Sequence, residues 1–369
     1  MVLHYAHQDI SPGDIAAVLK VLQSDRITQG PVIGRFEKAV ADYCGVSHAL
    51  AVTSGTAALH LGALALGLGP GKRLWTSPNS FVASANCALY CGAEVDFVDI
   101  DYADGNMSMD RLAGRLKQAR QKEELPDVVV PVHYAGQPCD LDRLAALSAE
   151  YGFAVMDDAS HALGARFRGQ PVGGLKADIS ILSFHPVKII TTGEGGMVLT
   201  NSAGLAEKIS ELRSHGISRA KKYSHMLEGP WSYVQTDLGF NYRMTDLQAA
   251  LGLSQMGRLD DFVGRRNFLA DRYDEVLADM PVEPLEVHDG RLSARHLYVI
   301  RMEGSDQRRR MFDALITHGI QPQVHYIPIH TQPYYRELGF QPGDFPAAER
   351  HYAGCLSLPL YPSMSDEDQ

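Results

Sequence analysis

Apolar stretches of two different periods alternate along the first 255 residues. Short, nearly continuous apolar runs predict buried strands, and longer stretches with an apolar spacing of three to four predict helices. The predicted strands span residues 48–54, 73–78, 94–101, 127–136, 153–158, 177–184 and 196–201. The predicted helices span residues 14–24, 34–45, 55–69, 81–92, 109–118, 141–152 and 203–216. This alternation is typical of an α/β fold with a mainly parallel sheet and helices on both faces.

The pattern changes after about residue 255. It predicts a charged amphipathic helix at 265–280, a strand at 296–302, a helix at 307–319 and a strand at 320–326. We therefore expect an N-terminal arm with a large domain over residues 1–255 and a small α+β domain over residues 256–369. The closing stretch "SMSDEDQ" is typical of the start of a helix, and we expect this helix to be cut short.

Composition narrows the class of protein. The formal net charge of -10 disfavours nucleic acid and anionic membranes as partners, because both require a basic surface. We find no apolar run of about 18 residues and no signal peptide at the start, so we expect a cytoplasmic protein without membrane segments. The cysteines lack a CxxC pair and are interpreted as reduced; they are Cys44, Cys87, Cys91, Cys139 and Cys355.

Two polar motifs fall where predicted strands end, at the edge where parallel sheets bind ligands. In "TSGTAAL" (53–59) a strand passes directly into a helix, whose free N–H groups can bind an anion. In "MDDASHALG" (156–164) a strand ends in two carboxylates, of which at least one reaches the edge. Ordinary helix capping explains each motif about equally well when it is taken alone.

The third feature is a single lysine, Lys188, in "SFHPVKIITTGEGG" (183–196). Apolar residues flank it, an unusual setting for an ammonium group, which prefers water. A lowered pKa would leave the amine neutral and able to form a Schiff base, whereas a lysine that reaches the surface is the commoner outcome. His185 is interpreted as a packed histidine, with substrate contact as the alternative.

Together these three features fit one cofactor. Pyridoxal 5'-phosphate (PLP) needs a phosphate anchor, a carboxylate beside its pyridine nitrogen and a lysine that forms a Schiff base. All three occur in chain order on one predicted sheet, and the combination predicts a PLP site without a metal.

The chain also resembles the sugar aminotransferases of the DegT/DnrJ/EryC1/StrS family. Similar stretches run along nearly the whole chain and include "TSGTAAL", "PVHYAGQPCDLD", "MDDASHALGA", "SFHPVKIITTGEGGMVLTN", "LGFNYRMTDLQAALGL" and "LSLPLYP". The resemblance implies the aspartate-aminotransferase-like fold, fold type I of PLP-dependent transferases. Lysine at position 188 favours transamination, because a dehydratase branch of this family has histidine there.

The family pattern implies a role for each matching residue. Lys188 is the catalytic lysine and holds the cofactor, and Asp158 faces the pyridine nitrogen. The other residues implied to bind the cofactor are Thr56, Ala57 and Ser183 at the phosphate, Phe81 on the ring face, His161 near the ring hydroxyl, and Asn241 at the phosphate of the partner subunit. The residues implied to bind substrate are Tyr5, the turn of Ile27, Thr28, Gln29 and Gly30, and the pair His325 and Tyr326.

Within the family, "SFHPVKIITTGEGG" and "DRITQGP" are most similar to the transaminases of pseudaminic acid biosynthesis. This similarity implies a homodimer with shared active sites that moves the amino group of L-glutamate to C4 of a UDP-linked 4-keto-6-deoxy-N-acetylhexosamine. The nearest alternative is another UDP-sugar 4-aminotransferase, of the bacillosamine or aminoarabinose type. A PLP-binding regulator without turnover is an alternative from a different class, against which the intact lysine, aspartate and phosphate loop argue.

Overall fold

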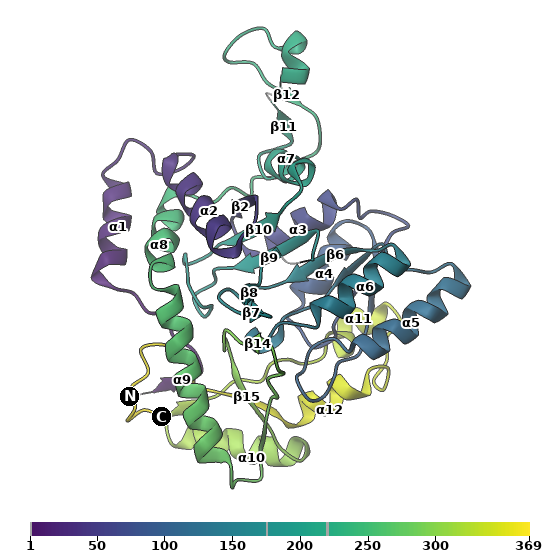
Figure 1. Ribbon diagram of the computed structural model, residues 1–369, viewed down its shortest axis with the longest axis vertical. Helices are drawn as coiled ribbons and strands as arrows, with labels where there is room; N and C mark the ends of the chain where they lie inside the picture. Colours follow the sequence, from purple (N-terminus) through teal and green to yellow (C-terminus); the bar gives the residue numbers. More distant parts are fainter. Residues whose placement is uncertain (1, 175, 219–220) are drawn as a thin grey trace.

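The structure is a computed structural model that describes residues 2–174, 176–218 and 221–369. A seven-stranded sheet with the order β2-β10-β9-β6-β5-β3-β4 lies at its centre (Figure 1). The strands are β2 (His48–Val52), β3 (Arg73–Thr76), β4 (Glu94–Phe97), β5 (Val128–Val130), β6 (Ala154–Asp158), β9 (Ile179–Ser183) and β10 (Gly196–Thr200). Strand β10 runs antiparallel to β2 and β9, and the other strands run parallel to one another. The predicted α/β fold with a mainly parallel sheet is confirmed.

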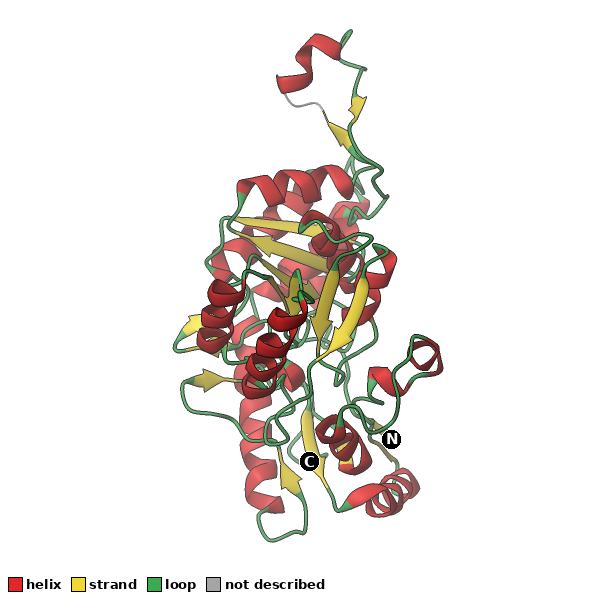
Figure 2. Cartoon of the chain, turned by 90° about the vertical axis from the view of Figure 1, so that its right-hand side faces the viewer, coloured by secondary structure: helices red, strands yellow, loops and turns green. Residues whose placement is uncertain are grey.

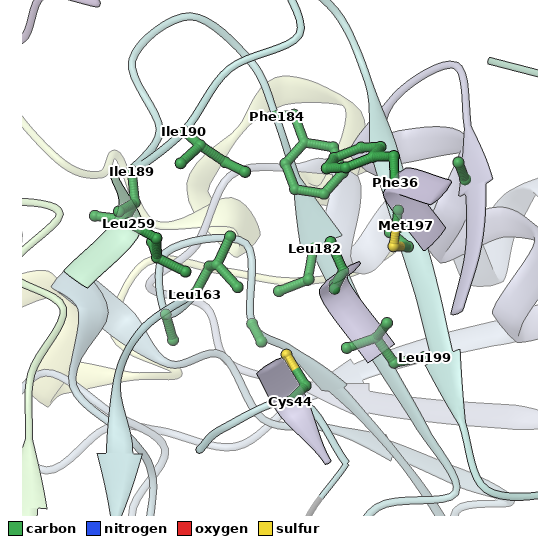
Figure 3. Packing of buried hydrophobic residues seen from close by; sticks show 14 of the residues in the cluster. Phe36, Cys44, Leu163, Leu182, Phe184, Ile189, Ile190, Met197, Leu199 and Leu259 are labelled. Atoms are coloured by element: carbon green, nitrogen blue, oxygen red, sulfur yellow. The ribbon is translucent and has the colours of Figure 1, made fainter. Parts of the chain in front are cut away.

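Helices cover both faces of this sheet (Figure 2), because neighbouring strand residues point to opposite faces and both sets are apolar. Val198 packs toward α3, α4 and α7, whereas Met197 packs toward α2 and α8. Figure 3 shows the second layer, in which Phe36 and Phe184 have ring centroids 5.1 Å apart. The helices around the sheet are α2 (Pro31–Cys44), α3 (Gly55–Ala65), α4 (Ala83–Tyr90), α5 (Met109–Lys122), α6 (Leu141–Tyr151), α7 (Ala203–Leu212) and α8 (Asp246–Met256).

The C-terminal part of the chain builds an antiparallel sheet, β13-β15-β17, at the other end of the molecule. Apolar residues of α9 and α10 pack on it. Both chain ends lie at this end of the molecule (Figure 1). The elements are α9 (Leu259–Leu277), β13 (Glu283–Pro284), β15 (Tyr298–Arg301), α10 (Gly304–Thr317), α11 (Pro333–Glu337), α12 (Pro346–Gly354) and β17 (Cys355–Leu358). The domain boundary at residue 255 stays a prediction.

The strand expected over residues 320–326 is much shorter than predicted. Only β16 (Ile320–Gln321) forms, in parallel pairing with β1 (Leu3–His4). Pro322 follows and has no N–H with which to continue the ladder. His325 and Tyr326 therefore lie in a loop. The helix predicted from residue 265 also begins earlier, at Leu259.

Short elements complete the fold. A hairpin of β11 and β12 projects from the body of the molecule in both views (Figures 1 and 2). No helix within the described ranges combines the length and the apolar character needed to cross a membrane. The remaining elements are α1 (Pro12–Leu22), β7 (Arg166–Phe167), β8 (Gln170–Pro171), β11 (Ile217–Ser218), β12 (Val234–Gln235), β14 (Arg291–Leu292), and the 3-10 helices η1 (Tyr134–Gly136), η2 (Lys221–Met226) and η3 (Ile329–Thr331).

Candidate active site

A cavity of about 490 Å³ opens at the carboxyl ends of β2, β6 and β9. One wall comes from the turns that follow these strands, and the other comes from the N-terminal segment and the C-terminal loops. The structure thus brings together residues from both ends of the chain. The predicted site residues that line this cavity are Tyr5, Thr56, Phe81, Asp158, His161, Ser183, Lys188, His325 and Tyr326.

Lys188 lies in a tight turn after β9, where its backbone N–H donates to the carbonyl of His185 at 2.9 Å. The next two residues, Ile189 and Ile190, are buried in the core beneath the cavity (Figure 3). This apolar anchor holds the lysine at the sheet edge. Burial lowers the pKa of Lys188 to about 8, and the charge of Asp158 acts in the opposite direction. The amine is therefore partly neutral near physiological pH, as the Schiff-base chemistry requires.

A glutamine that the sequence did not single out fixes the loop behind Lys188. The side-chain carbonyl of Gln255 accepts the N–H of Thr191 at 2.9 Å, and its amide donates to the backbone carbonyl of Asp9 at 2.7 Å. Gln255 is buried, and its bond to Thr191 is shielded from water, whereas its bond to Asp9 is partly buried. A Cβ on Gly196 would collide with the backbone of Ser54, which explains why glycine stands at this position after Glu194.

The two adjacent aspartates at the end of β6 have different partners. Asp158 faces the cavity, and its carboxylate accepts from the Ser84 hydroxyl at 2.7 Å and from the Ser160 N–H at 3.1 Å. Asp157 points into the interior, where it lies 3.0 Å from His133 Nε2. His133 Nδ1 accepts a backbone N–H, so Nε2 carries the hydrogen and donates it to Asp157. Asp158 is thus the carboxylate that can meet a ligand.

The start of α3 and the end of β9 form a cradle for an anion. Ser54 caps the helix by accepting the N–H of Ala57 at 3.1 Å. The N–H groups of Gly55 and Thr56 lie in the first turn, where a helix offers no acceptor. A Cβ on Gly55 would lie 3.0 Å from Cβ and 3.2 Å from Oγ of Ser183, so glycine lets the Ser183 hydroxyl approach the helix start.

Three buried histidines lie close together near Lys188. His161 Nε2 lies 3.2 Å from the Tyr326 hydroxyl, and its ring centroid lies 4.3 Å from that of His296. His325 Nδ1 lies 2.7 Å from the Ser357 hydroxyl. Burial lowers the pKa of His325 to about 3 and lowers those of His161 and His296 well below the usual histidine value. These rings are therefore neutral at pH 7, so they offer both a donor and an acceptor nitrogen.

His185 is not the packed histidine that we expected. Its side chain is exposed and lines the cavity together with Glu194. The proline that follows, Pro186, belongs to the tight turn, which directs His185 outward rather than into the core. Phe81 also lines the cavity and is 59% exposed, so its ring has room for a ligand against it.

The remaining predicted site residues do not line this cavity; they are Ala57, Asn241 and the turn of residues 27–30. The turn of residues 27–30 is fastened to the start of α8, where Asp246 accepts the Gly30 N–H at 2.6 Å and donates its own N–H to the Ile27 carbonyl at 3.0 Å. Asn241 pairs with Ser214 through a backbone bridge. Asn241 and this turn thus stand apart from the Lys188 of their own chain, and their predicted roles stay predictions.

The cavity fits PLP. It offers a cradle for the phosphate at Gly55 and Ser183, a carboxylate at Asp158, and the amine of Lys188. His161 Nδ1 is buried and has no hydrogen-bond partner in the described part of the chain, so a polar group of a ligand would satisfy it.

The comparison with known proteins agrees with this geometry. The sequence profile described as "DegT/DnrJ/EryC1/StrS aminotransferase family" matches residues 8–369. The "Spore coat polysaccharide biosynthesis protein SpsC" of Bacillus subtilis is 39% identical over 99% of this chain and 94% of its own length. The "UDP-4-amino-4,6-dideoxy-N-acetyl-beta-L-altrosamine transaminase" of Campylobacter jejuni is 38% identical over 100% of this chain and 94% of its own length. The solved structure of Helicobacter pylori PseC, an aminotransferase involved in pseudaminic acid biosynthesis, superposes with a TM-score of 0.92 at 32% identity and covers 100% of this chain and 96% of that chain.

Proposed function

Because the chain belongs to the DegT/DnrJ/EryC1/StrS aminotransferase family, we propose that it transfers the amino group of L-glutamate to C4 of a UDP-linked 4-keto-6-deoxy-N-acetylhexosamine. It is a PLP-dependent sugar aminotransferase. The identity of the donor and of the sugar is the proposal. The Campylobacter jejuni relative supports it, since that protein's name gives a UDP-linked 4-amino-4,6-dideoxy sugar and its similarity extends over the whole chain.

One observation carries the proposal: Lys188, Asp158 and the anion-binding start of α3 share a single cavity. A regulator that only binds PLP would have no need of a free lysine with a pKa lowered to about 8 by burial. We therefore set aside the alternative of a regulator without turnover.

Bound PLP supplies an electron sink for the charge that remains when a proton leaves the substrate carbon. Asp158 would keep the pyridine nitrogen protonated, and the bonds from Ser84 and Ser160 hold its carboxylate in place for this task. The Lys188 amine, once free, would take the proton from the substrate carbon at Nζ and later return it. A pKa near the working pH suits a group that must both accept and donate a proton.

The other predicted residues receive roles in the same proposal. Thr56, Ala57 and Ser183 hold the phosphate, Phe81 covers the ring face, and His161 meets the ring hydroxyl. Tyr5, His325 and Tyr326 contact the sugar nucleotide from the opposite wall of the cavity. Asn241 and the turn of residues 27–30 serve the site of a second subunit, which would make the active unit a homodimer.

The identity of the sugar is the part of the proposal for which the named relatives differ. The Bacillus subtilis relative is named for a spore coat polysaccharide, so similar family members serve different glycans. A sugar of the bacillosamine or aminoarabinose type would require the same Lys188 chemistry and a different fit at the opposite wall. The substrate must therefore be decided by reaction rather than by resemblance.

The test is a comparison of two epimers. The purified protein is mixed with PLP, L-glutamate and either UDP-4-keto-6-deoxy-L-arabino-N-acetylhexosamine or its D-xylo epimer, and products are followed by mass spectrometry and NMR. We expect amination of the L-arabino sugar. Preference for the D-xylo sugar would keep the aminotransferase and overturn the pseudaminic assignment. If glutamate converts bound PLP while neither sugar reacts, the sugar class is wrong.

A further inference from the structure

His296 is a histidine at the active site to which the sequence assigned no role. Its Nε2 lies 3.5 Å from Nζ of Lys188. We propose that His296 is a positioning residue, which accepts a hydrogen from Nζ and aims the free Lys188 amine at the substrate carbon. The proposal rests on the proposed function in its use of glutamate as the amino donor and of Lys188 as the group that moves the proton.

The backbone around His296 is fixed from two sides. The buried guanidinium of Arg266 donates through one nitrogen toward the carbonyls of Arg295, His296 and Leu360, at 3.3, 3.4 and 2.8 Å. On the other side the chain lies directly against Gly136, where a Cβ would come within 3.0 Å of the His296 nitrogen. Gly136 has φ +97°, which glycine adopts without strain. This fixed backbone and the neighbouring His161 ring, whose centroid lies 4.3 Å away, limit where the His296 ring can lie, so that the ring can impose a direction on the flexible lysine side chain.

The surroundings of His296 keep it neutral. It is 2% exposed, and the groups that face it are Lys188, His161, His325 and Arg266. Burial, followed by these neighbours, lowers the pKa of His296 well below its usual value. A neutral imidazole has one nitrogen with a free lone pair, which can accept from Nζ, whereas an imidazolium beside the lysine would repel its ammonium form.

The direction of the Lys188 amine matters because, in the proposed function, this amine moves the proton of the substrate carbon. An amine on a four-carbon chain has many rotamers, and a fixed acceptor selects those with the lone pair toward the cavity. The distance of 3.5 Å is long for a hydrogen bond. Catalytic hydrogen bonds are often long in the absence of ligand and shorten in the complex.

The test compares two substitutions that differ in their ability to accept a hydrogen bond. His296→Leu removes the acceptor, and His296→Gln restores one. In rapid mixing of the PLP-loaded protein with glutamate, we expect His296→Leu to slow the half-reaction by about 10- to 100-fold. The isotope effect with α-deuterated glutamate should rise, the apparent affinity for glutamate should stay the same, and His296→Gln should recover most of the rate.

A second readout does not depend on turnover. Acetylation of Lys188 in the full-length protein without PLP, followed by mass spectrometry across about pH 6 to 10, reports the state of its amine. We expect a midpoint near 8 for the unsubstituted chain and for His296→Gln, and a lower midpoint for His296→Leu, because its ammonium form has lost an acceptor. If the unsubstituted protein fails to react with glutamate, the donor assignment fails while this titration still tests His296.

The control is a histidine of equal burial away from the cavity. His330 is fully buried and its Nε2 lies 2.9 Å from Glu349. His330→Leu should lower the melting temperature and leave the half-reaction and the Lys188 titration unchanged. The proposal is overturned if folded His296→Leu matches the unsubstituted chain within about twofold. It is equally overturned if His296→Gln is as slow as His296→Leu, since shape and not the acceptor would then matter.

Discussion

The two walls of the cavity are built by different means. The sheet wall consists of Thr56, Asp158, Ser183 and Lys188, each of which ends a strand or closely follows one. The C-terminal wall includes His325 and Tyr326, and His296 lies beside Lys188; all three residues lie in loops outside the seven-stranded sheet. The strand ends bring the first set to one edge of the sheet, whereas contacts between distant parts of the chain alone position the second.

Those distant contacts can be named. Tyr134 is fully buried, and its hydroxyl donates to the carbonyl of His325 at 2.6 Å and lies 3.2 Å from His351 Nε2. Arg266 fixes the segment at His296. In the proposed function, the sheet wall would supply the groups for PLP chemistry, and the C-terminal wall would select the sugar without disturbing them.

Substitution of the two adjacent aspartates at the end of β6 gives the sharpest test of the sheet wall. Asp158→Asn removes the charge that faces the cavity, and we expect turnover to fall by about 100-fold or more. Asp157→Asn is the matched control, because it weakens only the bond to His133 and should cost about 1–3 kcal/mol of stability. Turnover per folded molecule, with unfolding measured in parallel, checks both. Equal loss of turnover in the two variants would mean that the assignment of Asp158 is wrong.

The stability of the C-terminal wall should depend more strongly on acid than that of the sheet wall. Burial lowers the pKa of His325 and that of His351 to about 3, below the value of about 6.5 in an unfolded chain. The unfolded state therefore binds more protons, so the stability is complete above pH 6.5 and is lost as the pH falls toward 3. At about pH 5 each histidine should contribute a loss of about 2 kcal/mol.

Denaturant unfolding of the unsubstituted chain and of His351→Gln measures this effect. The loss of unfolding free energy between about pH 7.5 and about pH 5 should be smaller in the variant, by the contribution of one histidine. An identical loss in both proteins would show that His351 does not titrate with unfolding.

The smallest expected effect concerns the phosphate cradle. Gly55→Ala places a Cβ 3.0 Å from Cβ of Ser183, a crowded contact that either pushes the hydroxyl away or shifts the helix start. We expect PLP to bind about tenfold more weakly, which corresponds to a cost of about 1–2 kcal/mol. Gly13→Ala in α1 is a control, since its Cβ would meet the Ser11 hydroxyl at an ordinary contact distance of 3.5 Å. Unchanged PLP affinity in Gly55→Ala would contradict the cradle.

The sequence predicted best those residues whose positions depend on short-range order. Strand ends and the residues after them depend on short-range order, so Lys188, Asp158 and the start of α3 could be placed at one edge of a sheet from the sequence alone. His296 and Gln255 could not, because their importance arises where residues 136, 266 and 296, or 9, 191 and 255, meet in space. The strand predicted over residues 320–326 was too long, because a proline after two residues ends the pairing of β16.

The most direct test of the account follows one nitrogen atom. The protein is incubated with PLP, ¹⁵N-labelled L-glutamate and the L-arabino 4-keto sugar nucleotide, and the product is examined by NMR beside Lys188→Ala. We predict ¹⁵N on C4 of the sugar with the unsubstituted chain, and turnover reduced by about a thousandfold or more in Lys188→Ala. Label on the sugar at comparable rates with both proteins would show that Lys188 does not carry the reaction. No label with either would show that glutamate and this sugar are not its substrates.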